Sequence, residues 1–260
     1  MKFLLIGDVV GKGGRMALRS LVPDLRRELG LAFVIANGEN MAGGGGMTRK
    51  CLDELKDAGI DAYTGGDHMW DQRELVTEIA GLRNVLRPAN LPGSQPGVGH
   101  RIFSIPIGGE VLVVSLLGRT FMKHHVDCPF KTLDRILTEM AGRTSQIIID
   151  FHAEATSEKT AMARYFDGRV SAVLGTHTHV PTADETIFPG GTAFQCDVGM
   201  VGARESILGR HVAPVLEGFV TGMPVRFTVN DDGIRFHATL VETNAAGRAV
   251  RIERIVRDLA

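Results

Sequence analysis

The sequence predicts an α/β protein in which helices cover β-sheets, and three observations lead to this fold class. Apolar runs of strand length recur along the chain, and stretches with apolar residues three and four apart lie between them. After about Gly222 an alternation of apolar and polar residues replaces both patterns. The 260 residues can bury a large core and contain no linker or repeat, so we expect one domain over residues 1–260.

The chain up to about residue 200 holds the alternating strands and helices. Strands are expected at the short apolar runs, which are residues 3–6, 33–36, 62–64, 111–117, 147–149, 170–174 and 193–196. Helices are expected at residues 15–29, 49–58, 72–79, 131–140 and 158–166, with Thr48, Asp71 and Ser157 as candidate N-caps. The last part is expected to form an antiparallel tail from residues 225–229, 234–241 and 250–256, with a turn at residues 230–233.

Charge, cysteine content and hydropathy exclude several classes of protein. The formal net charge is −1, so no overall positive field attracts nucleic acid, and any contact with RNA has to be local. The three cysteines are far apart and show no CxxC pair, which is typical of reduced thiols in the cytosol. No apolar run approaches the length that spans a bilayer. We therefore expect a cytoplasmic protein without a membrane segment.

Polar residues of the kinds that bind metals follow five of the predicted strands. Open α/β sheets place their ligand sites beyond the carboxyl ends of the strands, so these residues are expected to converge. The five segments are Gly7-Asp8, Asn37-Gly38-Glu39-Asn40, Gly65-Gly66-Asp67-His68, Asp150-Phe151-His152 and Gly175-Thr176-His177-Thr178-His179. Each segment taken alone is better explained by a helix cap or by a surface or core histidine. Together they contain the carboxylates and imidazoles that two divalent cations need.

His177 and His179 form the most distinctive pair in this set. An i, i+2 spacing at the end of a strand points both imidazoles to the same side, where both can bind metal. The alternative is an exposed strand edge without a ligand. Among the other histidines, His124 and His125 are candidates to approach a substrate.

Five sequence strings in and around these segments resemble a known family. The order of an aspartate, Glu-Asn, Asp-His, a histidine and His-x-His is similar to that of calcineurin-like metallophosphoesterases. The strings GDVVGKGGR, ANGENMAGG, TGGDHMWD, DFHAEATSEK and GTHTHVPTAD resemble the YmdB family of bacterial phosphodiesterases, over essentially the whole chain. The resemblance implies a sandwich of two central β-sheets flanked by helices, a dinuclear metal centre, and hydrolysis of phosphodiester bonds with 2′,3′-cyclic nucleotides as the substrate class.

The resemblance also implies roles for particular residues. One metal would be bound by Asp8, Glu39, Asn40 and His179, and the other by Glu39, Asp67, His152 and His177. Glu39 would bridge the two cations, and His68 would act as the general acid beside them. The residues that bind the substrate stay unknown. Carboxylate, amide and imidazole ligands suit two divalent or mixed-valence ions, with Fe or Mn expected and Zn as a third candidate.

Two positions depart from the patterns of the related enzymes. Broader metallophosphoesterases begin with Asp-x-His, whereas Val10 stands in the histidine position here, and the resemblance makes Asn40 the compensating ligand. Asp67 stands where the family usually has asparagine. The extra negative charge is expected to weaken the attraction for phosphate and to hold the second cation more tightly. The alternative is that Asp67 binds the metal as asparagine would.

These residues predict a reaction and leave two other functions open. A hydroxide activated by the metals is expected to attack phosphorus, while His68 protonates the ribose oxygen that leaves. A nucleotide- or RNA-binding regulatory protein would keep the metal-site scaffold with little turnover. A metal-dependent hydrolase of carbon substrates would use similar ligands and would cleave p-nitrophenyl acetate rather than phosphodiesters. Homo-oligomer formation and an RNA-related role stay open.

Overall fold

The computed structural model describes residues 1–106 and 108–259, and it contains two β-sheets packed face to face. The strands of the first sheet are β1 (Lys2–Ile6), β2 (Asp8–Val9), β3 (Phe33–Asn37), β4 (Ala62–Thr64), β5 (Val85–Leu86), β12 (Met200–Ala203), β13 (Ile234–Thr243) and β14 (Ala249–Asp258). Their order is β2-β12-β13-β1-β3-β4-β5, and β14 also pairs with β13. β1, β3, β4 and β5 are parallel, whereas β13 is antiparallel to β1 and to β14.

The second sheet is parallel in its centre and antiparallel at both edges. Its strands are β6 (His100–Ser104), β7 (Glu110–Leu117), β8 (Gln146–His152), β9 (Ala172–Thr176), β10 (Thr186–Ile187) and β11 (Ala193–Gln195), in the order β10-β11-β9-β8-β7-β6. β7, β8, β9 and β11 run parallel. Parallel strands end at one edge of a sheet, so the loops that follow β8 and β9 lie near each other.

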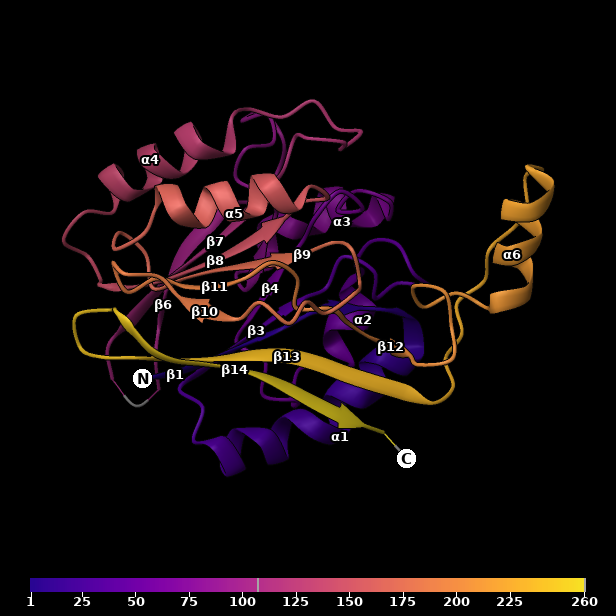
Figure 1. The fold of residues 1–260 in the computed structure, drawn as a ribbon, viewed down its shortest axis with the longest axis horizontal. Coiled ribbons are helices and arrows are strands. Elements are labelled where there is room, and N and C mark those ends of the chain that lie inside the picture. Colours follow the sequence, from indigo (N-terminus) through magenta and orange to yellow (C-terminus); the bar gives the residue numbers. More distant parts are fainter. Residues whose placement is uncertain (107, 260) are drawn as a thin grey trace.

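Helices cover the outer faces of both sheets, as Figure 1 shows. The helices are α1 (Gly11–Leu29), α2 (Arg49–Asp53), α3 (Arg73–Glu78), α4 (Pro129–Glu139), α5 (Thr156–Tyr165) and α6 (Val212–Thr221), and a 3₁₀ turn at Ile79–Gly81 follows α3. α1 packs on the first sheet, and α4 and α5 pack on the second. The predicted sandwich of two sheets flanked by helices is confirmed.

Alternation along the strands builds three apolar layers. In β1, Phe3 and Leu5 face the second sheet, while Leu4 and Ile6 face α1. Val111 and Val113 of β7 likewise join the layer between the sheets. Both faces of the central strands are therefore buried, which explains why they appear in the sequence as continuous apolar runs.

The predicted helices occur with shifted ends. α1 begins at Gly11 rather than at residue 15, and α2 ends at Asp53 rather than at residue 58. Thr48 is confirmed as an N-cap, because its hydroxyl accepts a hydrogen bond of 3.2 Å from the backbone N–H of Cys51. Ser157 is wrong as an N-cap, since α5 begins one residue earlier, at Thr156.

The C-terminal prediction is partly wrong. β13 pairs with β14, and residues 244–248 connect the two strands. Residues 225–229 form no strand, and within this segment Val229 makes a single β-bridge with Arg210. The alternation in that segment instead places Phe227 against α6, at Gly218. α6 was not predicted, and it stands apart from the two sheets in Figure 1. None of the helices in the described part of the chain is long and apolar enough to cross a membrane.

Candidate metal centre

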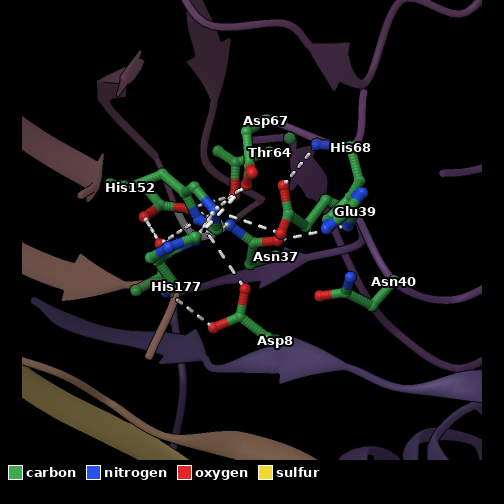
Figure 2. A network of polar contacts seen from close by, with 12 residues as sticks. Asp8, Asn37, Glu39, Asn40, Thr64, Asp67, His68, His152 and His177 are labelled. Atoms are coloured by element: carbon green, nitrogen blue, oxygen red, sulfur yellow. Dashed lines mark hydrogen bonds and ion pairs between the residues drawn. The ribbon is translucent and has the colours of Figure 1, made fainter. Parts of the chain in front are cut away.

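The candidate site lies where the ends of strands from both sheets meet. Asp8 begins β2, just beyond the end of β1, and Glu39 and Asp67 follow β3 and β4. From the second sheet, His152 is the last residue of β8 and His177 follows β9. Figure 2 shows these side chains directed toward one another. The structure therefore brings together residues from all five strand ends singled out in the sequence.

Four of these residues form a compact cluster. One ligand atom from each of Glu39, Asp67, His152 and His177 lies within 4.8 Å of the other three. His152 Nε2 is 3.0 Å from Asp67 Oδ1 and 3.1 Å from Glu39 Oε1. His177 Nδ1 is 3.3 Å from the same oxygen of Asp67. Carboxylates and imidazoles at this spacing could hold a divalent transition-metal ion.

The other three predicted ligands lie beside this cluster. Asp8 Oδ1 is 3.7 Å from His152 Nδ1, and Asp8 Oδ2 accepts a hydrogen bond of 3.0 Å from the backbone N–H of His177. Asn40 and His179 form a separate pair, with His179 Nε2 3.2 Å from Asn40 Oδ1. The seven residues thus form a cluster of four and a pair, with Asp8 next to the cluster.

The pKa shifts in the site follow from buried charges that lie close together. Burial raises the pKa of Asp8 well above its ordinary value, an effect that His152 opposes and Glu39 increases. Burial also acts to raise the pKa of Asp67, but hydrogen bonds with His152 and His177 outweigh it and hold this pKa well below its usual range. The same carboxylates raise the pKa of His152 well above its ordinary value, against the effect of burial. The carboxylates therefore favour positive charge at the centre of the cluster, which a bound cation would supply.

Two features of the site fit a bound metal. Asp8 is fully buried, and its Oδ1 has no hydrogen-bond partner among the described residues. Such an oxygen is costly to bury unless another group satisfies it. His152 Nε2 and His177 Nδ1 face each other at 3.0 Å, with an oxygen of Asp67 close to both. Oxygen and imidazole donors that converge in this way are a typical set for a transition metal.

Gly66 permits the close approach of the loop after β4 to the cluster. A Cβ atom at this position would lie 2.1 Å from Glu39 Oε2 and 2.3 Å from the ring of His152. Both distances are far below contact distance, so no larger residue fits there without moving a member of the cluster. The backbone N–H of His68 also donates to Glu39 Oε2 at 3.2 Å. The Gly66 segment therefore sets the position of Glu39 as well as that of Asp67.

His68 is held at the edge of the cluster by Asp71. The distance from His68 Nδ1 to Asp71 Oδ2 is 2.8 Å, and the His68 side chain is 43% exposed. Because Nδ1 faces Asp71, the opposite ring nitrogen is directed away from this carboxylate. Asp71 was expected to cap a helix, and this prediction is wrong: Gln72 is the N-cap residue of α3, and the Asp71 carboxylate contacts a histidine instead.

The loop that carries His177 and His179 does not continue β9. β9 ends at Thr176, and the two histidines have φ angles of 103° and 64°, in the left-handed region. The predicted strand-end geometry is therefore wrong, although both rings border the same cavity. The ring of His177 lies in the cluster, whereas that of His179 contacts Asn40 and the carbonyl oxygen of Leu208.

A buried ion pair supports this histidine loop. Lys159 Nζ is 2.8 Å from Asp197 Oδ2, and both side chains are only 1% exposed. Asp197 Oδ2 also accepts a hydrogen bond of 3.0 Å from the backbone N–H of Thr178, which lies between the two histidines. The other oxygen of Asp197 accepts from the backbone N–H of Gly199 at 2.8 Å. Asp197 thus fixes the loop through its backbone, and Lys159 balances the charge.

Two cavities of about 440 Å³ each open beside His68. Several of the residues that line them were not predicted from the sequence. The first extends from the cluster to Arg210, Phe219 and Phe227. Glu154 borders it, with Oε2 3.1 Å from His177 Nε2. The position of Glu154 two residues after His152 was the signal that could have identified it. The residues near α6 gave no such signal, because they lie far from the motifs in the sequence.

Comparison with protein families identifies a match over nearly the whole chain. The model of the family described as YmdB-like protein matches residues 4–255. The chain is 45% identical over 257 residues to a protein of Bacillus subtilis (strain 168) named 2′,3′-cyclic-nucleotide 2′-phosphodiesterase. The match covers 98% of this chain and 97% of the Bacillus protein.

Two solved structures share the whole fold. A hypothetical protein from Thermus thermophilus aligns with a TM-score of 0.92 and 43% sequence identity, covering 99% of both chains. A protein from Mycoplasma pneumoniae described as a novel phosphatase aligns with a TM-score of 0.91 and 32% identity. That match covers 99% of this chain and 93% of the Mycoplasma chain.

Replacing Lys159 by methionine should destabilise the protein, because the charge of Asp197 would remain buried without its partner. Removing one partner of a buried ion pair lowers the free energy of unfolding by about 3–5 kcal/mol. Urea denaturation measures this change. Lys131→Met is the matched control, since Lys131 is an exposed lysine on α4, and it should change that energy by less than about 0.5 kcal/mol. Equal stability of the two variants would show that the buried pair contributes little.

Proposed function

Because the chain belongs to the YmdB-like family, we propose that it is a metal-dependent phosphodiesterase that hydrolyses 2′,3′-cyclic nucleotides. The observation that carries this proposal is the cluster of Glu39, Asp67, His152 and His177, with the unpartnered oxygen of Asp8 beside it and an oriented His68 at its edge. The name of the Bacillus relative supports the substrate class.

The seven predicted ligands are proposed to hold two cations. Asp8, Glu39, Asn40 and His179 would hold one, and Glu39, Asp67, His152 and His177 the other. The contact between Asn40 and His179 supports the first set, and the compact cluster supports the second. Glu39 is the proposed bridge because a carboxylate has two oxygens to share. Oxygen and imidazole ligands favour Fe or Mn, with Zn as the third candidate.

When bound, two divalent cations make a nucleophilic water available at neutral pH and neutralise the oxygens of the phosphoryl group. The residues of this chain set how much positive charge remains for that task. Asp8, Glu39 and Asp67 supply three negative charges against the four positive charges of two divalent ions. Asparagine at position 67 would leave one more positive charge in the site, so Asp67 favours retention of metal over attraction for phosphate.

His68 is proposed to protonate the ribose oxygen that leaves. Its side chain is partly exposed and borders both cavities, so a substrate can reach it. The contact between Nδ1 and Asp71 fixes the orientation of the ring and leaves Nε2 free to carry the proton to the leaving group. A ribose oxygen leaves poorly without a proton, and general-acid catalysis typically contributes about 10²–10⁴ to the rate.

His177→Ala and His179→Ala are expected to deplete different metals. His179→Ala should weaken the site that contains Asp8 and Asn40, and His177→Ala the site that contains Asp67 and His152. Loss of a direct ligand weakens binding by more than the roughly 10–100-fold typical of an outer-shell change. Metal content per chain, measured by elemental analysis after dialysis, checks this expectation. Two metals per chain in both variants would exclude these ligand assignments.

Asp67→Asn is expected to lower metal retention and to leave or raise turnover when metal is in excess. The substitution removes one negative charge from the site, which weakens the hold on the cation and makes it a stronger Lewis acid. Chelator titration of both proteins should show at least about tenfold weaker retention in the variant. If Asp67 does not bind metal, neither the chelator titration nor the acidic limb of the activity against pH should change.

His68→Ala should lower kcat for adenosine 2′,3′-cyclic phosphate by about 10²–10⁴ while two metals stay bound. The loss on bis-p-nitrophenyl phosphate should be much smaller, because p-nitrophenolate leaves without a proton. Asp71→Asn should give an intermediate loss with the same dependence on the leaving group. Equal losses on both substrates, or loss of metal, would mean that His68 is a ligand or a structural residue.

The same assays separate the phosphodiesterase from a binding protein. The proposal is contradicted if metal-loaded wild-type protein cleaves neither phosphodiester faster than the His68→Ala variant does. Such a result would favour a nucleotide- or RNA-binding regulatory role for the same scaffold.

A further inference from the structure

We propose that the apolar wall of the first cavity, formed by Val215 and Phe219 of α6 and by Phe227, is the subsite for the nucleobase of the substrate. This inference rests on the proposed function and extends it, because it states which residues distinguish a nucleotide from any other cyclic phosphate. The name α6 wall is used below for these three residues.

The α6 wall and the metal centre belong to one cavity. Its lining includes Glu39, His177 and His179 at one end and the α6 wall at the other. The cavity volume of about 440 Å³ lies in the range of sites that bind small molecules. A substrate whose phosphate lies at the metal centre therefore has room to extend toward α6.

The polarity of the two cavities decides which one suits a base. The second cavity, of similar size, has one aromatic side chain, Phe121, and is otherwise lined mainly by charged and polar groups such as Asp67, Asp71 and Lys123. The first is lined mainly by apolar side chains at the end away from the metal centre. A flat base gains most by covering aromatic rings, so the first cavity is the better site. His68 borders both cavities, which places the phosphoryl group at their junction.

The two aromatic side chains of the α6 wall are partly exposed. Phe219 is 80% exposed and Phe227 is 46% exposed. The ring of Phe227 packs on the helix at Gly218, where a Cβ atom would lie 3.4 Å from it, so its position is set by α6. Val215 is buried, so the two rings supply most of the exposed surface of the wall. Exposed aromatic rings next to a polar reaction centre are typical of a stacking surface for bases.

Arg210 adds a fixed positive charge to the same cavity. Its Nη2 donates a hydrogen bond of 2.6 Å to the carbonyl oxygen of Gly44, in the loop that follows Glu39 and Asn40. The guanidinium group therefore cannot turn away into solvent without losing this bond. A cation in this cavity favours an anionic ligand with an apolar part, which describes a nucleotide.

The test compares substrates with and without a base. Phe219→Ala and Phe227→Ala should lower the ratio of kcat/KM for adenosine 2′,3′-cyclic phosphate to that for glycerol 1,2-cyclic phosphate by about 5- to 100-fold each. The second substrate has the same five-membered cyclic phosphate but no base. Val220→Ala is the matched control, because Val220 lies on the same helix, is 83% exposed and does not line the cavity, and it should keep the wild-type ratio.

Calorimetry with adenosine 3′-monophosphate tests the subsite without turnover. The two phenylalanine variants should bind it about 5- to 100-fold more weakly than wild type and the Val220→Ala control. This measurement stands even if wild-type protein hydrolyses neither cyclic phosphate, an outcome that would contradict the proposed function alone. The subsite is excluded if the phenylalanine variants keep both the substrate ratio and the affinity. The subsite is also excluded if the phenylalanine variants differ from wild type only in their sedimentation coefficient, measured by analytical ultracentrifugation. That result would assign the α6 wall to contacts between copies of the chain.

Discussion

The site depends on one electrostatic constraint, which is that three carboxylates lie close together with little of their surface exposed. Asp8 and Glu39 are almost completely buried, and Asp67 is 14% exposed. Burial raises the pKa of Asp8, whereas the histidines lower those of Glu39 and Asp67 against the effect of burial. Charges of one sign remain together in such a place only if opposite charge compensates them. This arrangement depends on the convergence of strand ends from two sheets, on the glycine at position 66 and on the oriented histidines.

A network below the cluster joins the two sheets without using its carboxylates. Asp150 of β8 accepts hydrogen bonds from Thr64 of β4, Asn37 of β3 and Thr176 of β9. Thr176 Oγ1 also lies 2.9 Å from His152 Nδ1, so the network orients the ring whose other nitrogen faces the cluster. Ligating histidines commonly have such partners on their second nitrogen. The position of His152 is therefore set by the fold.

The sequence was informative wherever the local pattern determines the structure. The apolar runs located the central strands, and the polar residues after them converge as expected, because the carboxyl ends of parallel strands share an edge. The failures have a different origin. Residues 225–229 alternate like a strand but have no sheet neighbour, Asp71 follows the pattern of a cap but contacts His68, and α6 packs little of its surface against the sheets. These outcomes depend on tertiary contacts that spacing alone does not contain.

The histidine loop illustrates why departure from regular structure matters at such a site. A continued strand would direct both rings to the same side, whereas the left-handed backbone at His177 and His179 sends one ring into the cluster and the other to Asn40. This conformation is unfavourable for residues with a Cβ atom, by about 1–3 kcal/mol each. Asp197 stabilises it by accepting a hydrogen bond from the N–H of the residue between the two histidines, and the buried carboxylate pairs with Lys159. The buried pair therefore supports a backbone conformation in which two neighbouring histidines contact two different groups of residues.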